Sequence, residues 1–328
     1  MAPPTKVGPP LCLRLQMPPR SVPRGGSDTE VMEFSIDLFC EQTGLDSPVL
    51  VHTGSSRVWR AESKDGRVLA VRVTDSGRNP ATLADADIVR AASGLVAAGC
   101  PVVTPASSQV VHIGSCAVTL WSWVDAGKDA HHRLGDWRFL GTGLRMVHST
   151  DSGLELAPLE ELLATRLTTR LAIITECQPE WVDDDQLATL TSVTAELLPL
   201  LPAAAAGTET VHGDFHHGNV IWSQPPVISD LEGLSRGSGA YDVAVLTERV
   251  RCYGLETALV DELVLGYGDD VRGDPGFEVL VRAKQMISTQ WCAVQAMRWP
   301  DLQEEAIKRL QWWRHGDGPA WKTNPGAK

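Results

Sequence analysis

The stretch that decides the fold runs from residue 212 to residue 219 and reads His212-Gly213-Asp214-Phe215-His216-His217-Gly218-Asn219. Asp230 follows eleven residues later, inside the run Val-Ile-Ser-Asp-Leu-Glu. Between them, two short apolar runs at 220–222 and 227–229 flank Ser-Gln-Pro-Pro and predict a short hairpin. We expect this hairpin to return Asp230 to the loop that carries Asp214 and Asn219.

The spacing His-x-Asp-x-x-x-x-Asn brings together the residue types that phosphoryl transfer requires. That reaction needs one carboxylate to orient and deprotonate the attacking hydroxyl, and oxygen ligands that hold Mg²⁺ on the triphosphate. Asp214 fits the first task, and Asn219 with Asp230 fits the second. The sequence therefore predicts a kinase with Mg²⁺ and ATP or GTP as its cofactors.

Two other interpretations of this stretch remain open. His212, Asp214, His216 and His217 could be metal ligands of a hydrolase, because imidazole and carboxylate groups commonly bind zinc. No second His, Asp or Cys cluster at ligand spacing occurs elsewhere in the sequence to complete such a site. The stretch could also be a polar turn without function, although the matched positions and the second Asp make this the weaker interpretation.

The motif His-Gly-Asp-x-His-x-Gly-Asn resembles the aminoglycoside phosphotransferase-like small-molecule kinases, of the APH and choline kinase type. Protein kinases differ, because the second position of their motif is usually Arg and a Lys precedes the Asn. The segment 239–244, Gly-Ala-Tyr-Asp-Val-Ala, is also similar to this family, and the resemblance covers about residues 48 to 250. It implies an α+β, bilobal, protein-kinase-like fold with a small β-rich N-lobe and a larger, mainly helical C-lobe.

The resemblance also implies a role for each polar residue of the motif. Asp214 is the catalytic base, and His212 supports the catalytic loop. Asn219 and Asp230 bind Mg²⁺, while Asp242 braces the catalytic loop. Two further acids are weaker candidates for touching the substrate, namely Asp125 and Glu232.

An N-terminal nucleotide lobe is predicted from two β-branched, apolar runs at 52–60 and 67–73. They flank Lys-Asp-Gly, a strong hairpin turn signal. Leu-Ala-Val-Arg at 69–72 follows at the distance where kinases carry Val-Ala-Ile-Lys, which places Arg72 at the α- and β-phosphates. The other predicted nucleotide-binding residues of this lobe are Gly54, Ser55 and Ser56 over the phosphates, Val58, and Ala70 at the adenine.

Arg72 is expected to have an acidic partner on the next predicted helix, from about residue 81 to residue 98. Asp87 lies on the apolar stripe of that helix, where a carboxylate needs a cation, so we predict that it pairs with Arg72. Asp85 is the alternative partner. Asp87 could equally be a solvated acid near a helix start, where the helix dipole favours it.

The run 118–125 alternates like a strand and ends where a hinge between lobes is expected. By the resemblance, backbone groups at 122–124 bind the adenine edge, and Trp121 and Trp123 are counted with the nucleotide-binding residues. Tryptophans at such spacing are also common in packed cores. Four helices are predicted in the C-lobe, at about 241–253, 256–267, 276–298 and 301–314.

Domain boundaries follow from these elements and from composition. Residues 1–27 contain seven prolines and no acidic residue, and we predict a disordered N-terminal extension there. The N-lobe is then expected at 28–124 and the C-lobe at 125–328. With 43% hydrophobic residues and no continuous apolar run of about 18, the 328-residue chain is expected to be cytoplasmic, without a membrane partner.

Charge and cysteine content restrict the partners. The net charge of −12 disfavours nucleic acid and would attract a cationic small molecule. Seven cysteines without a CxxC pair suggest reduced thiols rather than disulfides or a zinc site. A monomer or a homodimer is expected.

These features predict an ATP- or GTP-dependent O-phosphotransferase that modifies a hydroxyl of a small, amine-bearing molecule such as an antibiotic, in resistance or biosynthetic self-protection. A housekeeping metabolite kinase with a sugar, choline-like or homoserine-like acceptor is the alternative. A catalytically silent, nucleotide-binding kinase fold is a third hypothesis, suggested by Arg72 in place of Lys. The intact Asp214, Asn219 and Asp230 argue against it.

Overall fold

The structure is a computed structural model that describes residues 35–53, 56–75, 82–127, 133–316 and 320–322. All of them belong to the unit Phe34–Lys328. The predicted extension at 1–27, and Gly54 and Ser55 of the predicted phosphate loop, lie outside the described residues.

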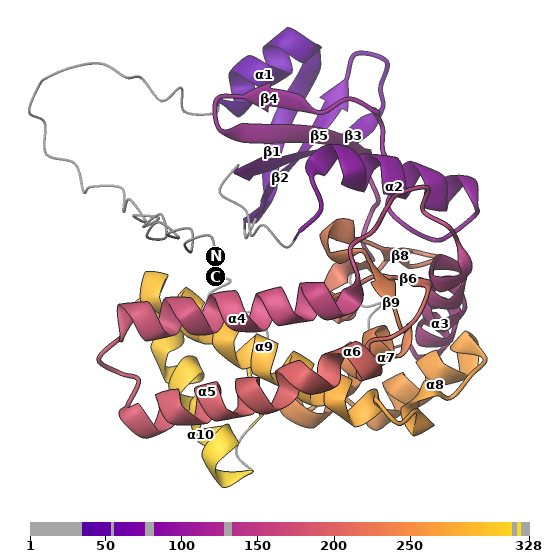
Figure 1. Ribbon diagram of the computed structural model, residues 1–328. Helices are drawn as coiled ribbons and strands as arrows, with labels where there is room; N and C mark the ends of the chain where they lie inside the picture. The colour runs from indigo at the N-terminus through magenta and orange to yellow at the C-terminus, as the bar shows by residue number, and fades with distance from the viewer. Residues whose placement is uncertain (1–34, 54–55, 76–81, 128–132, 317–319, 323–328) are drawn as a thin grey trace, which may run out of the picture. The chain divides into compact units, whose positions relative to one another are not determined.

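The N-terminal part of this unit is an antiparallel sheet in the order β1-β2-β3-β5-β4 (Figure 1). Its elements are α1 Ile36–Thr43, β1 Leu45–Thr53, β2 Ser56–Ser63, β3 Val68–Asp75, α2 Asp85–Ala97, β4 Val111–Ile113 and β5 Cys116–Ser122. The predicted hairpin is confirmed between β2 and β3, where Gly66 takes a φ of 80° that glycine adopts without strain.

Strand β3 shows how the sheet divides its residues between two faces. Val71 and Val73 are buried with Phe39 of α1 in a small apolar core. Ala70 and Arg72 alternate with them and are half-buried on the opposite face. The sheet therefore packs against α1 on one side and presents the predicted nucleotide-binding residues on the other.

The remaining part is mainly helical. Its helices are α3 Leu134–Ser149, α4 Leu159–Cys177, α5 Asp184–Leu197, α6 Leu201–Ala204, α7 Ala240–Tyr253, α8 Thr257–Tyr267, α9 Phe277–Arg298 and α10 Gln303–His315. Its strands are β6 Glu209–Val211, β7 Val220–Ile221, β8 Val227–Ile228 and β9 Ser235–Gly237. The predicted C-lobe helices are confirmed as α7 to α10, with small differences at their ends.

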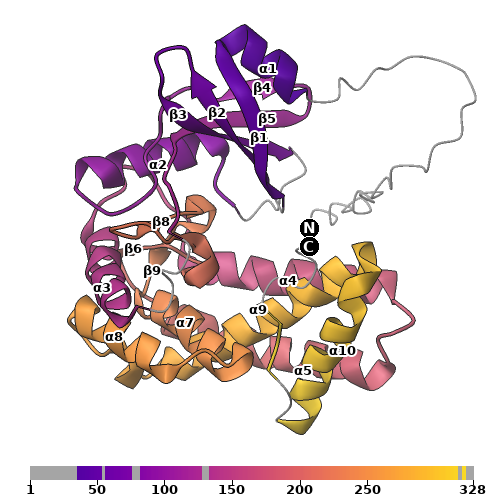
Figure 2. The same cartoon turned by 180° about the vertical axis from the view of Figure 1, so that it is seen from behind.

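Helix α9 lies at the centre of the helical part and packs against α4, α5, α7 and α10. Figures 1 and 2 show α4 and α9 side by side from opposite directions. Because neighbours cover it on several sides, even polar side chains of α9 are buried, among them Lys284, Gln285 and Thr289. Such residues require internal partners.

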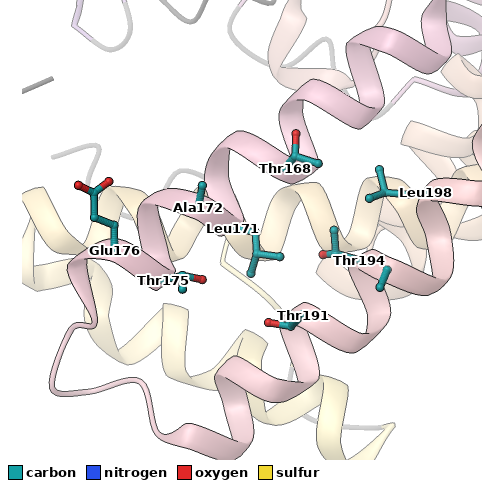
Figure 3. A pocket seen from close by; sticks show the side chains of 9 residues that line it. Thr168, Leu171, Ala172, Thr175, Glu176, Thr191, Thr194 and Leu198 are labelled. Carbon is teal, nitrogen blue, oxygen red and sulfur yellow. The ribbon is translucent and has the colours of Figure 1, made fainter. Parts of the chain in front are cut away.

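The segment Asp184–Ala204, which covers α5 and α6, is long and apolar enough to cross a membrane by length and composition alone, with a mean hydropathy of 1.4 over 18 of its residues. It contacts α4, α9 and α10. Between α4 and α5 lies an open hollow of about 500 Å³, and Figure 3 shows Thr168, Leu171 and Ala172 of α4 opposite Thr191 and Thr194 of α5. None of the predicted site residues lines this hollow.

Candidate active site

Asp242, in the first turn of α7, holds the loop that follows β6 through hydrogen bonds to its backbone. The backbone N–H groups of His212 and Gly213 donate to its two carboxylate oxygens at 2.8 and 2.9 Å. His148 of α3 donates from Nε2 to Asp242 Oδ2 at 2.8 Å, and its Nδ1 accepts from the Tyr267 hydroxyl at 2.8 Å. These side chains are buried, and the hydrogen bonds among them satisfy their polar atoms. The contact implied for Asp242, which braces the loop, is therefore part of a hydrogen-bond network in the interior.

Gly213 fixes the bend of this loop. Its φ is 81°, and a Cβ built on it would overlap the carbonyl oxygen of Gly233. Its own carbonyl oxygen accepts from Arg166 Nη1 of α4 at 2.8 Å. The loop is therefore clamped between α4, α7 and the short turn at 231–233.

Gly213→Ala is expected to lower the free energy of unfolding by about 2–4 kcal/mol, because the new Cβ adds a left-handed strain and a steric overlap. Gly66→Ala is the matched control, since Gly66 has a φ of 80° and no atom within 4 Å of its built Cβ. Urea denaturation of both variants measures the difference. Equal destabilisation of the two would contradict a clamped loop.

Asp214 projects from this loop with its side chain 34% exposed. Its Oδ1 accepts from Lys284 Nζ at 2.6 Å, and its Oδ2 lies 3.9 Å from His216 Nε2. Burial alone would raise the pKa of Asp214, but the charge of Lys284 and its hydrogen bond, together with the charge of Arg166, hold this pKa well below its usual value. Asp214 is therefore ionised at neutral pH and able to accept a hydrogen bond from a hydroxyl.

Asn219 and Asp230 are brought to the same place by the predicted hairpin, which is confirmed as β7 and β8. Asn219 Nδ2 donates to the backbone oxygen of Asp214 at 2.9 Å. Ser229 N donates to the backbone oxygen of Asn219 at 2.8 Å, and His212 Nε2 donates to the backbone oxygen of Ser229 at 2.9 Å. His212 thus ties the loop to the strand that precedes Asp230.

Asp230 begins the turn at 231–233 with a φ of 61°, a conformation that few non-glycine residues adopt. Burial and the neighbouring charge of Glu232 raise the pKa of Asp230 to about 6, against the opposing effect of Arg72. Carboxylate and amide oxygens are the donors that Mg²⁺ prefers when it is shared with phosphates. Asn219, Asp230 and Glu232 therefore fit a divalent cation.

A self-sufficient metal cluster is not found in the described ranges, where no group of three or more His, Cys, Asp or Glu side chains could hold an ion. His216 Nδ1 instead accepts from the backbone N–H of Gly218 at 3.0 Å, and burial and Arg249 hold the pKa of His216 well below its usual value. With Nδ1 accepting, the neutral ring of His216 carries its proton on Nε2, which disfavours a role as a zinc ligand.

Arg72 is the link between the sheet and this acidic group. Its Nη2 lies 3.2 Å from Asp230 Oδ1 and 2.9 Å from Glu232 Oε2, and its Nε donates to Ser56 Oγ at 3.3 Å. The predicted pairing with Asp87 is wrong: Asp87 accepts from Arg90 at 2.6 Å in the exposed first turn of α2. The alternative, Asp85, accepts from Thr74 Oγ1 at 2.9 Å.

The sheet register places the other predicted nucleotide-binding residues around Arg72. Val58 lies opposite Arg72 on β2, and Ala70 lies opposite Trp121 on β5, so all of them share one face. Trp123 follows β5; its backbone N–H donates to Val68 O at 3.2 Å and its Nε1 to Asp125 Oδ1 at 2.8 Å.

Lys284 and Arg166 are site residues that the sequence did not indicate. They lie in the long helices α9 and α4, 70 and 48 residues from Asp214 in the chain. Neither belongs to a motif. Only the packing of α4 and α9 against the loop shows their position.

Fold and site together define a small-molecule kinase with a protein-kinase-like architecture. The chain belongs to the phosphotransferase enzyme family, whose sequence model matches residues 49–279. This confirms the family and the enzyme class predicted from the catalytic motif.

Solved structures share the fold. A thermostable mutant of aminoglycoside phosphotransferase APH(4)-Ia is 14% identical, with 86% of this chain and 99% of that one covered and a TM-score of 0.64. Amicoumacin kinase hAmiN in complex with AMP-PNP, Ca²⁺ and Ami is also 14% identical, with 84% and 93% covered and a TM-score of 0.60. A choline/ethanolamine kinase family protein from Mesorhizobium loti is 16% identical, with 82% and 88% covered and a TM-score of 0.57. No curated protein sequence matches the chain.

Proposed function

We propose that this kinase transfers the γ-phosphoryl group of ATP or GTP to a hydroxyl of a small molecule, with Mg²⁺ as the bound cation. The observation that carries the proposal is the position of Asp214. Its ionised carboxylate lies on a braced loop whose backbone is hydrogen-bonded to Asn219, and the β7–β8 hairpin returns Asp230 to the same loop. The complex of hAmiN with AMP-PNP and Ca²⁺ supports nucleotide and divalent cation use in this fold.

In the proposed reaction, Asp214 Oδ2 accepts the hydrogen bond of the acceptor hydroxyl and takes its proton as the oxygen attacks the γ-phosphorus. The bond between the γ-phosphorus and the β,γ-bridging oxygen breaks, and the nucleoside diphosphate leaves. Arg72 binds phosphate oxygens through its planar guanidinium. Asn219 and Asp230, with Glu232 beside them, would hold Mg²⁺, which neutralises charge on the phosphates when bound.

The charge of the protein, overall and close to Asp214, bears on the class of acceptor. The net charge of −12 favours an amine-bearing acceptor, and antibiotic kinases occur among the structural neighbours together with choline/ethanolamine kinases. Beside Asp214, however, lie four cationic side chains whose charges interact with its carboxylate, against the neighbouring acids Asp230 and Glu248; the cations are Lys284, Arg166, Arg170 and Arg249. We therefore propose that the part of the acceptor next to the reacting hydroxyl is neutral or acidic rather than amine-rich.

A matched acceptor panel tests this proposal. Each member is a hydroxy compound prepared with an amine, an amide or a carboxylate close to the hydroxyl, and antibiotics are included as a separate set. We expect the amide or carboxylate form to have a kcat/KM at least about tenfold above its amine form, because like charges repel in a partly buried site. A consistent preference for amines would overturn the charge assignment and favour the aminoglycoside-type acceptor.

A further inference from the structure

The residue that contacts the carboxylate of Asp214 lies outside the catalytic motif. Lys284 is in the middle of α9, and its side chain is 6% exposed. Its Nζ lies 2.6 Å from Asp214 Oδ1. Because an ammonium group so deeply buried is costly without a partner, this contact is a built feature of the site rather than a surface ion pair.

The other cationic side chains close to Asp214 contact other groups. Arg166 Nη1 donates to the backbone oxygen of Gly213 at 2.8 Å, and Arg170 Nη1 donates to the backbone oxygen of Ile287 at 3.0 Å. Arg249 lies over the ring of Tyr253 at 4.2 Å, and its Nε is 3.5 Å from Glu248. Within the described part of the chain, Lys284 is the residue whose side chain donates a hydrogen bond to the Asp214 carboxylate.

The contact divides the two oxygens of this carboxylate. Oδ1 is taken by Lys284, whereas Oδ2 has His216 Nε2 at 3.9 Å, beyond hydrogen-bond distance. A carboxylate on a loop could rotate about its side-chain torsions, but an oxygen fixed from a 22-residue helix cannot. The arrangement therefore leaves one oxygen, in one orientation, for the hydroxyl of the acceptor.

We propose that Lys284 is a positioning residue for phosphoryl transfer, which holds Asp214 through Oδ1 so that Oδ2 faces the acceptor hydroxyl. The inference rests on the proposed function, since it assigns to Asp214 the role of base. A positioning contact and a purely structural ion pair differ in what their removal changes. A structural pair changes stability, whereas a positioning contact changes kcat while nucleotide binding is kept.

The test is a series at position 284, measured with nucleotide and the best acceptor of the panel. Lys284→Met removes charge and donor, Lys284→Gln keeps a donor, and Lys284→Arg keeps the charge. We expect kcat to fall by about 10–100-fold in Lys284→Met, because small misplacements of a reacting group cost up to about 100-fold. KM for the nucleotide should change by no more than about twofold, and Lys284→Arg should recover part of the lost kcat.

Lys308→Met is the matched control, because Lys308 Nζ lies 2.7 Å from Glu305 on α10, also partly buried. It should alter the melting temperature and leave kcat unchanged. If Lys284→Met does not fold, Lys284→Gln decides, with at least a tenfold loss of kcat expected. A kcat within about threefold of wild type in the folded Met or Gln variant, or losses in proportion to the unfolded fraction, would overturn the inference.

Asp214→Asn in the same assay separates this inference from the proposed function. If Asp214→Asn is inactive while the folded Lys284 variants keep their kcat, only the role of Lys284 is wrong. If Asp214→Asn turns over like wild type, the base itself is misassigned and the proposed function fails.

Discussion

Asp214→Asn is expected to lower kcat by about 10²–10⁴-fold, the range associated with loss of a general base. The substitution keeps the shape of the side chain but removes the charge that accepts the hydroxyl proton. Nucleotide binding should be unchanged, because Arg72 pairs with Asp230 and Glu232, whereas the Asp214 carboxylate pairs with Lys284. Steady-state turnover and nucleotide titration together measure both effects.

The control for this variant is Asp151→Asn. The Asp151 side chain is 82% exposed and its nearest ion-pair partner, Arg236, is 4.0 Å away. Turnover of this control should equal wild type. Asp214→Asn that retains more than about a tenth of wild-type kcat would contradict the assignment of the base, since a general base contributes at least about 10²-fold.

Asp230→Asn is expected to lower kcat by about 10³-fold, because charge neutralisation by a metal ion in such reactions amounts to several kcal/mol. Removal of divalent cations from the wild-type protein should have an effect of similar size. The Asn side chain keeps one oxygen donor but lacks the charge that attracts the cation. Titration of Mg²⁺ at a fixed nucleotide concentration should show that the variant needs a much higher Mg²⁺ concentration than wild type for half-maximal activity.

The same substitution should not destabilise the cation-free protein. Burial and Glu232 raise the pKa of Asp230 to about 6. At pH 7 the carboxylate is therefore ionised in a folded site that disfavours its charge, which lowers the free energy of unfolding. A neutral Asn removes this charge, and the melting temperature without Mg²⁺ should be equal to or above that of wild type. A lower melting temperature together with lost activity would indicate that Asp230 is a structural residue and not a cation ligand.

Local patterns in the sequence predicted the parts of the fold that are set by nearby residues. The β2–β3 hairpin follows from Lys-Asp-Gly, and the β7–β8 hairpin follows from apolar runs around Ser-Gln-Pro-Pro. Helices α7 to α10 follow from apolar periodicity between Gly and Pro signals. The spacing of Asp214, Asn219 and Asp230 is the one that phosphoryl transfer requires, and the loop and the β7–β8 hairpin bring these residues together.

Long-range partners could not be predicted in this way. The sequence predicts an acidic partner for Arg72 on the next helix, but Arg72 contacts Asp230 and Glu232, 158 and 160 residues later in the chain. Lys284 reaches Asp214 across 70 residues. Such pairs depend on how helices and sheet pack, which the periodicity of one segment does not contain. The periodicity predicts Asp87 on the apolar stripe, although the buried residues of α2 begin at Ile88.

The central claim is phosphoryl transfer to a small-molecule hydroxyl with Asp214 as base, and phosphorus NMR of the reaction mixture tests it most directly. Purified protein is incubated with ATP, Mg²⁺ and the acceptor panel, beside Asp214→Asn and Asp151→Asn. The account predicts a new phosphate monoester signal, in equal amount to the nucleoside diphosphate formed, from wild type and Asp151→Asn but not from Asp214→Asn. An ester formed equally by Asp214→Asn, or nucleotide bound with no ester from any acceptor, would contradict it.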